Sequence, residues 1–462
     1  MSSPTAVAEV DTAPAAVPFG EALRFWLKLG FISFGGPAGQ IAIMHAELVE
    51  RRRWISERRF LHALNYCMVL PGPEAQQLAT YIGWLMHRTW GGIVAGGLFV
   101  LPSLFILIAL SWIYMAYGEQ PLVAGLFYGI KPAVTAIVVH AAHRIGSRAL
   151  NNGWLWAIAA AAFVAIFALQ VPFPLIVLGA ALAGFVGGRI APARFRSGGS
   201  HGAAASFGRA LIDDDTPAPP HARFAAWRLA WVIATGLVLW AAPLAFLIAL
   251  QGWPGTLPQM AWFFTKAALL TFGGAYAVLP YVYQGAVVQQ GWLSGAQMID
   301  GLALGETTPG PLIMVLAFVG FVGGWQASDL AALFGPDRRF VAGAAAAALV
   351  TWFTFLPSFV FILAGAPLVE ATHENLELTA PLTAITAAVV GVIVNLALFF
   401  GWNVLWPAGR EGPFEWPAAA IALAAAIALF RFGRGVIEVI AGCALIGLAA
   451  HWARGHAPGV LP

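Results

Sequence analysis

The sequence predicts an all-α polytopic membrane protein built from two copies of one unit, with helices that are broken inside the membrane. Of its 462 residues, 60% are hydrophobic and 10% are charged, whereas soluble domains carry about 25% charged residues. Apolar stretches of about 20 residues, the length that crosses a bilayer as a helix, recur along the chain, and we expect roughly 10–14 membrane segments. Examples are Gly91–Tyr114, Ala157–Gly188, Ala230–Leu250 and Phe340–Gly365. Their runs of Ala, Leu, Val and Ile lack the two-residue alternation of a membrane β-barrel.

The composition also excludes several classes of protein. The two cysteines, Cys67 and Cys443, lie in apolar surroundings and are too few for a disulfide framework or a zinc cluster. A net charge of +3 gives nucleic-acid binding no support. The sequence contains neither a Walker A phosphate-binding loop nor an HExxH metal motif. We therefore expect no cofactor, no metal site, no ATP hydrolysis by this chain and no enzymatic activity.

Two copies of one unit are visible at an offset of 238 residues, the separation of Phe34 and Phe272. The first copy contains, in order, Lys28, Ser33–Gly36, Trp54 and Pro71–Pro73. The second contains, at the same spacing, Lys266, Thr271–Gly274, Trp292 and Pro309–Pro311. This agreement indicates an internal duplication, which is typical of secondary transporters. The paired tryptophans are expected at the membrane interface.

The duplication divides the chain into five parts. These are a polar N-terminal tail (1–17), a first repeat (18–190), a polar linker (191–225), a second repeat (226–455) and a C-terminal tail (456–462). The linker is rich in Ser, Gly, Pro and charged residues, so we expect it to be flexible.

Charge predicts how the two repeats are oriented. The basic cluster Arg51–Arg59 corresponds to residues 289–297, which contain no Lys or Arg. Cytoplasmic loops collect Lys and Arg, so we expect a cytoplasmic linker and repeats that are inverted relative to each other. Arg88 and Arg338–Arg339 do not fit, because they make two corresponding connections both basic.

Lysine is rare, and its positions suggest function. The three lysines, Lys28, Lys131 and Lys266, lie in largely apolar segments. A charge at membrane depth costs several kcal/mol unless it faces a partner or a wet cavity. We expect Lys28 and Lys266 to bind a transported anion, and Lys131, which precedes Pro132 near an expected helix start, is a secondary candidate. The alternative is that each lysine reaches the headgroups from near a helix end.

Two kinds of segment break the apolar helices. They are the FGG segments, Phe34–Gly36 and Phe272–Gly274, and the PGP segments, Pro71–Pro73 and Pro309–Pro311. A break inside the membrane leaves free amides at the start of the next helix, and these amides attract anions. The alternative is that each PGP segment is a turn at the membrane edge. Besides the two lysines, the predicted substrate-binding residues are Ser33, Phe34, Gly35, Gly36, Pro71, Gly72, Pro73, Gln76, Gln77, Thr271, Gly273, Gly274, Thr307, Thr308, Pro309, Gly310 and Pro311.

Two carboxylates near the PGP segments are the candidates for proton coupling. Glu306 lies in an otherwise neutral segment, and its equivalent in the first repeat is Met68. Glu74 directly follows the first PGP segment. A carboxylate in a low-dielectric cavity can load and release a proton near neutral pH. The alternative for Glu306 is a structural role, either capping a helix or pairing with Lys266.

Taken together, these motifs resemble those of the chromate transporter (CHR) family. The family pattern Phe-x-x-x-Gly-x-x-Ser-Phe-Gly-Gly-Pro corresponds to Trp26–Pro37, with Trp26 in place of the first Phe, and the PGP segments follow. The resemblance covers both repeats and is to the long, two-domain type. It implies efflux of chromate from the bacterial cytoplasm, chromate resistance and drive by the proton gradient. It assigns no ligand role to Lys28, Lys266 or Glu306, and those roles are inferences from this sequence.

The sequence therefore predicts a secondary active transporter, specifically a proton-coupled antiporter, that exports chromate across the bacterial inner membrane. The expected partners are chromate, sulfate as a competitor, protons and the lipid bilayer, and a homodimer is compatible with the sequence. One alternative is a transporter of sulfate or another oxyanion. Another is a membrane-embedded enzyme that uses Glu306, although a one-site enzyme does not need a near-symmetric duplication.

Overall fold

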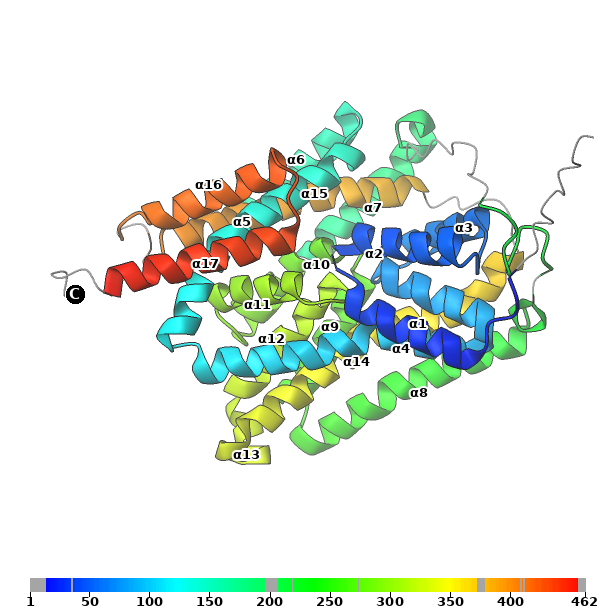
Figure 1. Cartoon of the computed structure of the whole chain (residues 1–462), viewed down its shortest axis with the longest axis horizontal. Coiled ribbons are helices and arrows are strands. Elements are labelled where there is room, and N and C mark those ends of the chain that lie inside the picture. Colours follow the sequence, from blue (N-terminus) through cyan, green and yellow to red (C-terminus); the bar gives the residue numbers. More distant parts are fainter. Residues whose placement is uncertain are drawn as a thin grey trace, which may run out of the picture.

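The computed structural model describes residues 14–34, 36–195, 207–217, 219–272, 274–371, 379–407, 409 and 412–455. Within these ranges the regular structure is helical, with one isolated bridge between Ile55 and Ile212 and no strand. Most of the long helices run along one common direction, which is roughly horizontal in Figure 1. The prediction of an all-α polytopic membrane protein is confirmed.

The helices of the two repeats correspond in order. The first repeat contains α1 (Phe19–Ile32), α2 (Gly36–His45), α3 (Glu57–Val69), α4 (Glu74–Tyr117), α5 (Pro121–Ala149), α6 (Gly153–Phe167) and α7 (Phe173–Ile190). Their equivalents are α9 (Thr256–Leu269), α10 (Ala275–Val282), α11 (Gly295–Thr307), α12 (Val315–Gln326) with α14 (Arg339–Ala371), α15 (Thr379–Leu405), α16 (Trp416–Phe430) and α17 (Val436–Gly455). The helices α8 (Ala226–Gln251) and α13 (Ser328–Phe334) belong to the second repeat alone.

The helices on either side of each FGG segment form a hairpin. One arm is α1 or α9, and the other is α2 or α10 followed by a π-helical turn (Ala46–Arg51 or Tyr283–Gln289). The two arms are held together by an edge-to-face ring pair, which joins Phe25 to Trp54 (4.9 Å between centroids) and Phe263 to Trp292 (5.5 Å). Both tryptophans are buried. They pack between the arms of their hairpins, and their position at the membrane interface remains a prediction.

Each PGP segment forms the tip of a second hairpin. In the second repeat, the two arms are α11 and α12, and Gly301 of α11 lies against the ring of Phe318 of α12. In the first repeat, the returning arm is the beginning of α4. The 44 residues of α4 would extend about 66 Å, twice the thickness of the hydrocarbon core. Non-helical dihedral angles at His87 and Arg88 (φ 58°) instead reverse the chain, and Thr80 in the first limb lies against Gly92 in the second.

Fewer described helices are long and apolar enough to cross a membrane than the 10–14 membrane segments expected, in part because several helices fold back as hairpins. Six described helices are long and apolar enough to cross, or seven if the bent pair Leu312–Gln326 and Ser328–Phe334 is one span. The hairpin helices have only 8 to 14 residues and fold back on their partners. Sequence periodicity distinguishes an apolar helix from a polar one, but it does not tell whether the chain continues or returns at a break.

The two repeats pack through equivalent helices that run antiparallel. Along the α4–α14 contact, Gly92 lies against Leu363 and Gly96 lies against Phe359, so the numbering rises on one helix as it falls on the other. The α5–α15 contact shows the same order, since Gly146 meets Val390 whereas Thr135 meets Gly401. The terminal helices are also exchanged: α16 and α17 pack on α5, and α6 and α7 pack on α15. Figure 1 shows α5, α15, α16 and α17 as one group.

The described part of the linker is attached to the first repeat. Ser56 donates a hydrogen bond to Asp214 (2.6 Å), and Arg59 donates one to the carbonyl of Thr216. These contacts hold residues 207–217 against the first repeat, whereas residues 196–206 and 218 of the linker lie outside the described residues. In Figure 1 this segment lies on the right-hand side, whereas α17 ends on the left.

Candidate functional site

The four hairpin tips meet where the two repeats join. The amide of Gly72, in the first PGP segment, donates to the carbonyl of Thr271 at the second FGG segment (2.8 Å). The amide of Gly310 donates to the carbonyl of Ser33 at the same distance. These two bonds are equivalent under the 238-residue offset. Pro37 and Gly274 bring the two FGG tips together as well, since a Cβ at Gly274 would lie 3.9 Å from the Pro37 ring.

The tips lie level with the middle of the long helices. A Cβ at Gly310 would come within 2.8 Å of Ser103, which is near the centre of the second limb of α4. A Cβ at Gly72 would come within 2.3 Å of the hydroxyl of Ser358, near the centre of α14. Both glycines have a positive φ (127° for Gly72 and 100° for Gly310), which side chains other than glycine rarely adopt. The PGP segments are therefore not turns at the ends of the helices.

Several buried polar side chains surround the tips with unused hydrogen-bonding capacity. Gln40 of α2 is 1% exposed, and its Nε2 donates to the carbonyl of Gly310 (2.5 Å). Among the described residues, its Oε1 has no partner, and the same holds for Gln76 Oε1, Gln77 Oε1 and Ser103 Oγ. The sequence analysis identified Gln76 and Gln77 but missed Gln40 and Ser103. A buried polar atom without a partner lowers the stability of a protein core, and such atoms are typical of a ligand site.

The tips also carry a carboxylate. Glu306 is 8% exposed and lies at the end of α11, next to the second PGP segment. The hydroxyl of Tyr276, in the first turn of α10, donates to its Oε1. The alternative in which Glu306 pairs with Lys266 does not occur in the structure. Tyr276 was not identified from the sequence, where its equivalent is Ala38.

Among the described residues, Arg144 is a cation that lies beside the tips, and it was not predicted as a site residue from the sequence. Its guanidinium extends from α5 to Gly36, where a Cβ would lie 3.8 Å from Nη2. It is close enough to Glu306 and Tyr276 to interact with both electrostatically. No sequence signal set this arginine apart, because it lies in the basic stretch His143–Arg148 and more than 100 residues from either FGG segment.

Lys28 and Lys266 occupy equivalent positions on α1 and α9, and both are exposed. The buried face of α1 consists of other residues, including Phe25, Trp26 and Leu29. The ammonium group of Lys266 lies 5.8 Å from the ring of Trp262, which is also exposed. The structure thus does not bring these lysines together with the hairpin tips.

Lys131 lies within α5 rather than at a helix start, and it belongs to a cluster that joins the repeats. Its ammonium group lies 3.3 Å from Asp300 of α11, and Tyr114 of α4 donates to the same carboxylate (2.8 Å). We call these three residues the outer cluster. Because Lys131 and Tyr114 come from the first repeat and Asp300 from the second, this cluster holds the repeats together.

A second cluster of the same composition lies elsewhere along the junction. Arg59 of α3 lies 3.6 Å from Glu370 of α14, and Tyr81 donates to this carboxylate (2.5 Å). Arg59 and Tyr81 belong to the first repeat and Glu370 to the second. We call this set of three residues the linker-side cluster, because Arg59 also donates to the linker.

The remaining predicted hydroxyl residues have local partners. The hydroxyls of Ser33, Thr271, Thr307 and Thr308 donate to carbonyls of their own helices. Glu74 is half-buried in the first turn of α4. Phe34 is half-buried beside the first tip, whereas Gly35 and Gly273 lie outside the described residues.

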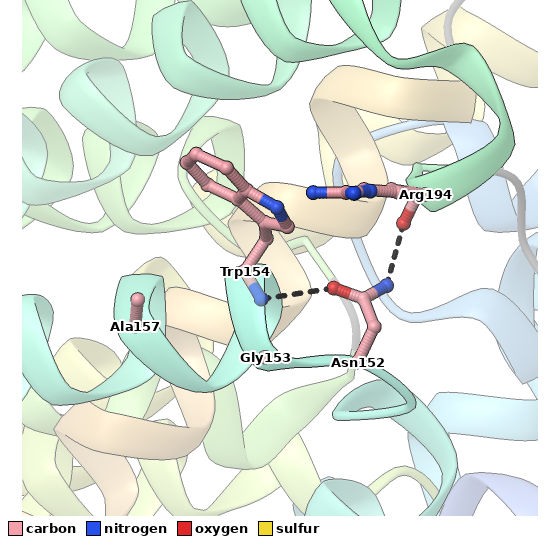
Figure 2. A pocket seen from close by; sticks show the side chains of 5 residues that line it. All are labelled: Asn152, Gly153, Trp154, Ala157 and Arg194. Carbon is pink, nitrogen blue, oxygen red and sulfur yellow. Dashed lines mark hydrogen bonds between the residues drawn. The ribbon is translucent and has the colours of Figure 1, made fainter.

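The described residues include no group of three His, Cys, Asp or Glu side chains that could hold a metal ion. A surface pocket of about 400 Å³ lies at the start of α6 and is drawn in Figure 2. Asn152 accepts from the amide of Trp154 (3.0 Å) and donates to the carbonyl of Arg194 (2.7 Å), so it caps α6 and fixes the turn after α7. This pocket contains no carboxylate or thiol and shares no residue with the hairpin tips.

Comparisons with known proteins place these features in a family. The family model described as Chromate transporter matches residues 20–185 and 258–448. A chromate transport protein of Pseudomonas aeruginosa is 35% identical over 399 residues, which cover 84% of this chain and 82% of the relative. One from Cupriavidus metallidurans is 28% identical over 451 residues (97% and 96%). The uncharacterized transporter YwrB of Bacillus subtilis is 27% identical over 164 residues, 35% of this chain and 83% of its own length. No solved structure matches.

Proposed function

Because the chain belongs to the chromate transporter family, we propose that it is a secondary active transporter that exports chromate from the bacterial cytoplasm across the inner membrane and so confers chromate resistance. The observation that carries this proposal is the reciprocal pair of tip contacts, Gly72 to Thr271 and Gly310 to Ser33. The helix that follows each of the four breaks at mid-span begins with backbone amides that can bind an anion. Irregular backbone is tolerated at this depth only where it is buried in protein or lines a cavity.

We further propose that the two repeats are inverted and work by alternating access. The antiparallel order of equivalent helices, seen for α4 with α14 and for α5 with α15, supports this arrangement. In such transporters the substrate lies between the repeats near the middle of the bilayer. The cytoplasmic side would then be the side of the linker, in line with the basic residues 51–59.

Alternating access requires a barrier on each side of the substrate, and the two inter-repeat clusters are suited to this role. Tyr114 lies eleven residues beyond Ser103 on α4. Tyr81 lies on the other side of Ser103, because its neighbour Thr80 packs against Gly92, which is eleven residues before Ser103. Each tyrosine is thus about 16 Å along the helix from the level of the tips. We propose that the linker-side cluster closes the cytoplasmic path and the outer cluster closes the opposite one.

The membrane potential favours export of a dianion. Moving one charge across roughly 100 mV changes the free energy by about 2.3 kcal/mol, so outward movement of two negative charges gains about 4.6 kcal/mol. Protons would be coupled through Glu306, the buried carboxylate at the tips. Sulfate resembles chromate in shape and charge and is expected to compete.

Purified protein in proteoliposomes tests the proposal. Vesicles loaded with labelled chromate should lose it faster when an interior-negative potential is imposed, and excess sulfate should slow the loss. A Gly310→Ala variant provides an inactive control, because its side chain would collide with Ser103. Loss of chromate at the same rate from vesicles without protein would contradict export. Stronger movement of sulfate than of chromate would favour a general oxyanion transporter.

A further inference from the structure

We propose that Arg144 is the residue that holds the transported dianion and that the protonation state of Glu306 sets how tightly the dianion binds. This inference rests on the proposed function, because it assigns the substrate contact within the junction of hairpin tips. It replaces the expectation that Lys28 and Lys266 neutralise the anion.

The first argument is the position of Arg144 relative to the other membrane cations. Lys131 is paired with Asp300, and Arg59 is paired with Glu370. Lys28 and Lys266 are exposed. Arg144 alone extends to a hairpin tip, and among the described residues its guanidinium forms no ion pair or hydrogen bond.

The second argument is the chemistry around the guanidinium. Arg144 lies beside Gly36, the first residue of the ten-residue helix α2, whose leading amides have no partner within the helix. The leading amides are those of Gly36, Ala38 and Gly39, because Pro37 has no N–H. At the neighbouring tip, the fully buried hydroxyl of Ser103 lies beside Gly310 and has no partner among the described residues, so it can donate to an anion. Guanidinium donates two parallel hydrogen bonds to an oxyanion, and amides complete a tetrahedral set. The expected ligand is therefore a tetrahedral dianion such as chromate or sulfate.

The third argument is the presence of one carboxylate near one guanidinium. The charged and titratable groups that face Glu306 from the described helices are Tyr276 on α10 and Arg144 on α5. Asp300 and Lys131, further along α11 and α5, are paired with each other. His140 lies one turn before Arg144 on α5. Glu306 and Arg144 form no ion pair in the structure but are close enough to interact electrostatically. An ionised Glu306 therefore repels a dianion held by Arg144, whereas a protonated Glu306 does not.

The two ligands of the site are therefore linked. A dianion binds more tightly when Glu306 is protonated, so its affinity rises as pH falls through the titration of this carboxylate. By the reciprocity of linkage, bound anion also favours protonation of Glu306. The proton then accompanies the anion across the membrane, and the cycle exports one net negative charge. This differs from the proton exchange expected from the sequence, and the membrane potential still drives it outward.

Equilibrium binding to purified protein in detergent tests the inference. The probes are labelled chromate and labelled sulfate, each at acidic and at alkaline pH. Sulfate keeps two charges over this range, so it separates protonation of the protein from protonation of chromate. For the wild type we expect at least tenfold tighter sulfate binding at the acidic end. Arg144→Gln should weaken binding of both probes by at least tenfold, and Arg144→Lys by less. Glu306→Gln should bind tightly at both pH values.

The chain offers matched controls on the same elements. Arg148→Gln removes an exposed arginine one turn further along α5, and Lys28→Gln removes an exposed lysine; both should bind like the wild type. Melting temperatures of all variants separate lost binding from lost folding, and Arg144→Lys keeps the test valid if Arg144→Gln does not fold. Wild-type affinity in folded Arg144→Gln would overturn the role of Arg144. Unchanged pH dependence in Glu306→Gln would overturn the link to Glu306. A wild type that binds neither probe at any pH would instead overturn the proposed function.

Discussion

The two repeats meet through the same backbone contacts but contribute different charges to them. Gly72 and Gly310 donate to equivalent carbonyls at equal distances. Near the same tips, the second repeat has Glu306, where the first has Met68. Arg144 of the first repeat corresponds to Ile393 of the second, if α5 and α15 are aligned at Pro132 and Pro381. The symmetric part holds the tips together, whereas the charges are free to differ because one substrate site needs only one of each.

The largest effect is expected from the symmetric part. The Cβ of Gly72→Ala would lie 2.3 Å from Ser358, and that of Gly310→Ala would lie 2.8 Å from Ser103. Both positions have a positive φ. The backbone strain alone costs about 1–2 kcal/mol. We expect either substitution to abolish transport and to lower the melting temperature. Gly97→Ala on α4, where a Cβ meets no atom within 4 Å, is the matched control and should transport normally.

A second substitution sharpens this comparison. The Cβ at position 72 collides with the hydroxyl of Ser358 (2.3 Å) and with Nε2 of Gln77 (2.6 Å), so Ser358→Ala should restore Gly72→Ala only in part. The Cβ at position 310 collides first with the Cβ of Ser103, so Ser103→Ala should not restore Gly310→Ala. Equal rescue in both halves, measured by melting temperature, would contradict the geometry of the tips.

The outer cluster should give the next largest effect, and the effect should depend on which partner is removed. Asp300 is 2% exposed and Lys131 is 35% exposed at the side chain. Lys131→Met leaves a buried carboxylate without its cation, which costs about 3–5 kcal/mol. Asp300→Asn leaves an ammonium group that solvent reaches, so we expect a smaller loss of stability. Thermal unfolding in detergent measures both, and a larger loss in Asp300→Asn would contradict this order.

How much of this site could be predicted from sequence depends on the distance between the residues involved. The duplication and the helix breaks were identified because each is a local pattern repeated at a fixed offset, and Glu306 was identified because it is a charge in an otherwise neutral segment beside one of these breaks. The hairpins were not predicted, because an apolar helix before a PGP segment has the same sequence signature whether the chain continues or returns. Arg144 was not predicted, because its contact with Gly36 joins residues more than 100 positions apart. Lys28 was predicted from its apolar surroundings, which also occur on a face exposed to lipid.

The linker-side cluster should give a smaller effect than the outer one. Glu370→Gln removes a carboxylate whose side chain is 9% exposed, but Arg59 keeps its hydrogen bond to the carbonyl of Thr216. We expect a loss of about 1.5–3 kcal/mol, the range of a hydrogen bond to a charged group. If this cluster closes the cytoplasmic path, Glu370→Gln should open it. Ser103→Cys in a cysteine-free background should then react faster with an impermeant thiol reagent added from the linker side. Asp300→Asn should raise reactivity from the opposite side, and faster reaction from one and the same side in both variants would contradict two barriers.

The smallest effect is expected for the two lysines, whose equivalent positions make them a direct test of where the anion binds. Lys28→Gln and Lys266→Gln remove exposed charges that form no ion pair within the described chain. Substitutions at such sites usually change stability by no more than about 0.5 kcal/mol. We expect both variants, and the double variant, to keep most of the chromate export of the wild type in proteoliposomes, whereas Arg144→Gln loses it. If the double variant lost export while Arg144→Gln kept it, the anion would follow a path along the outer faces of α1 and α9, and the junction of the tips would serve only to hold the repeats together.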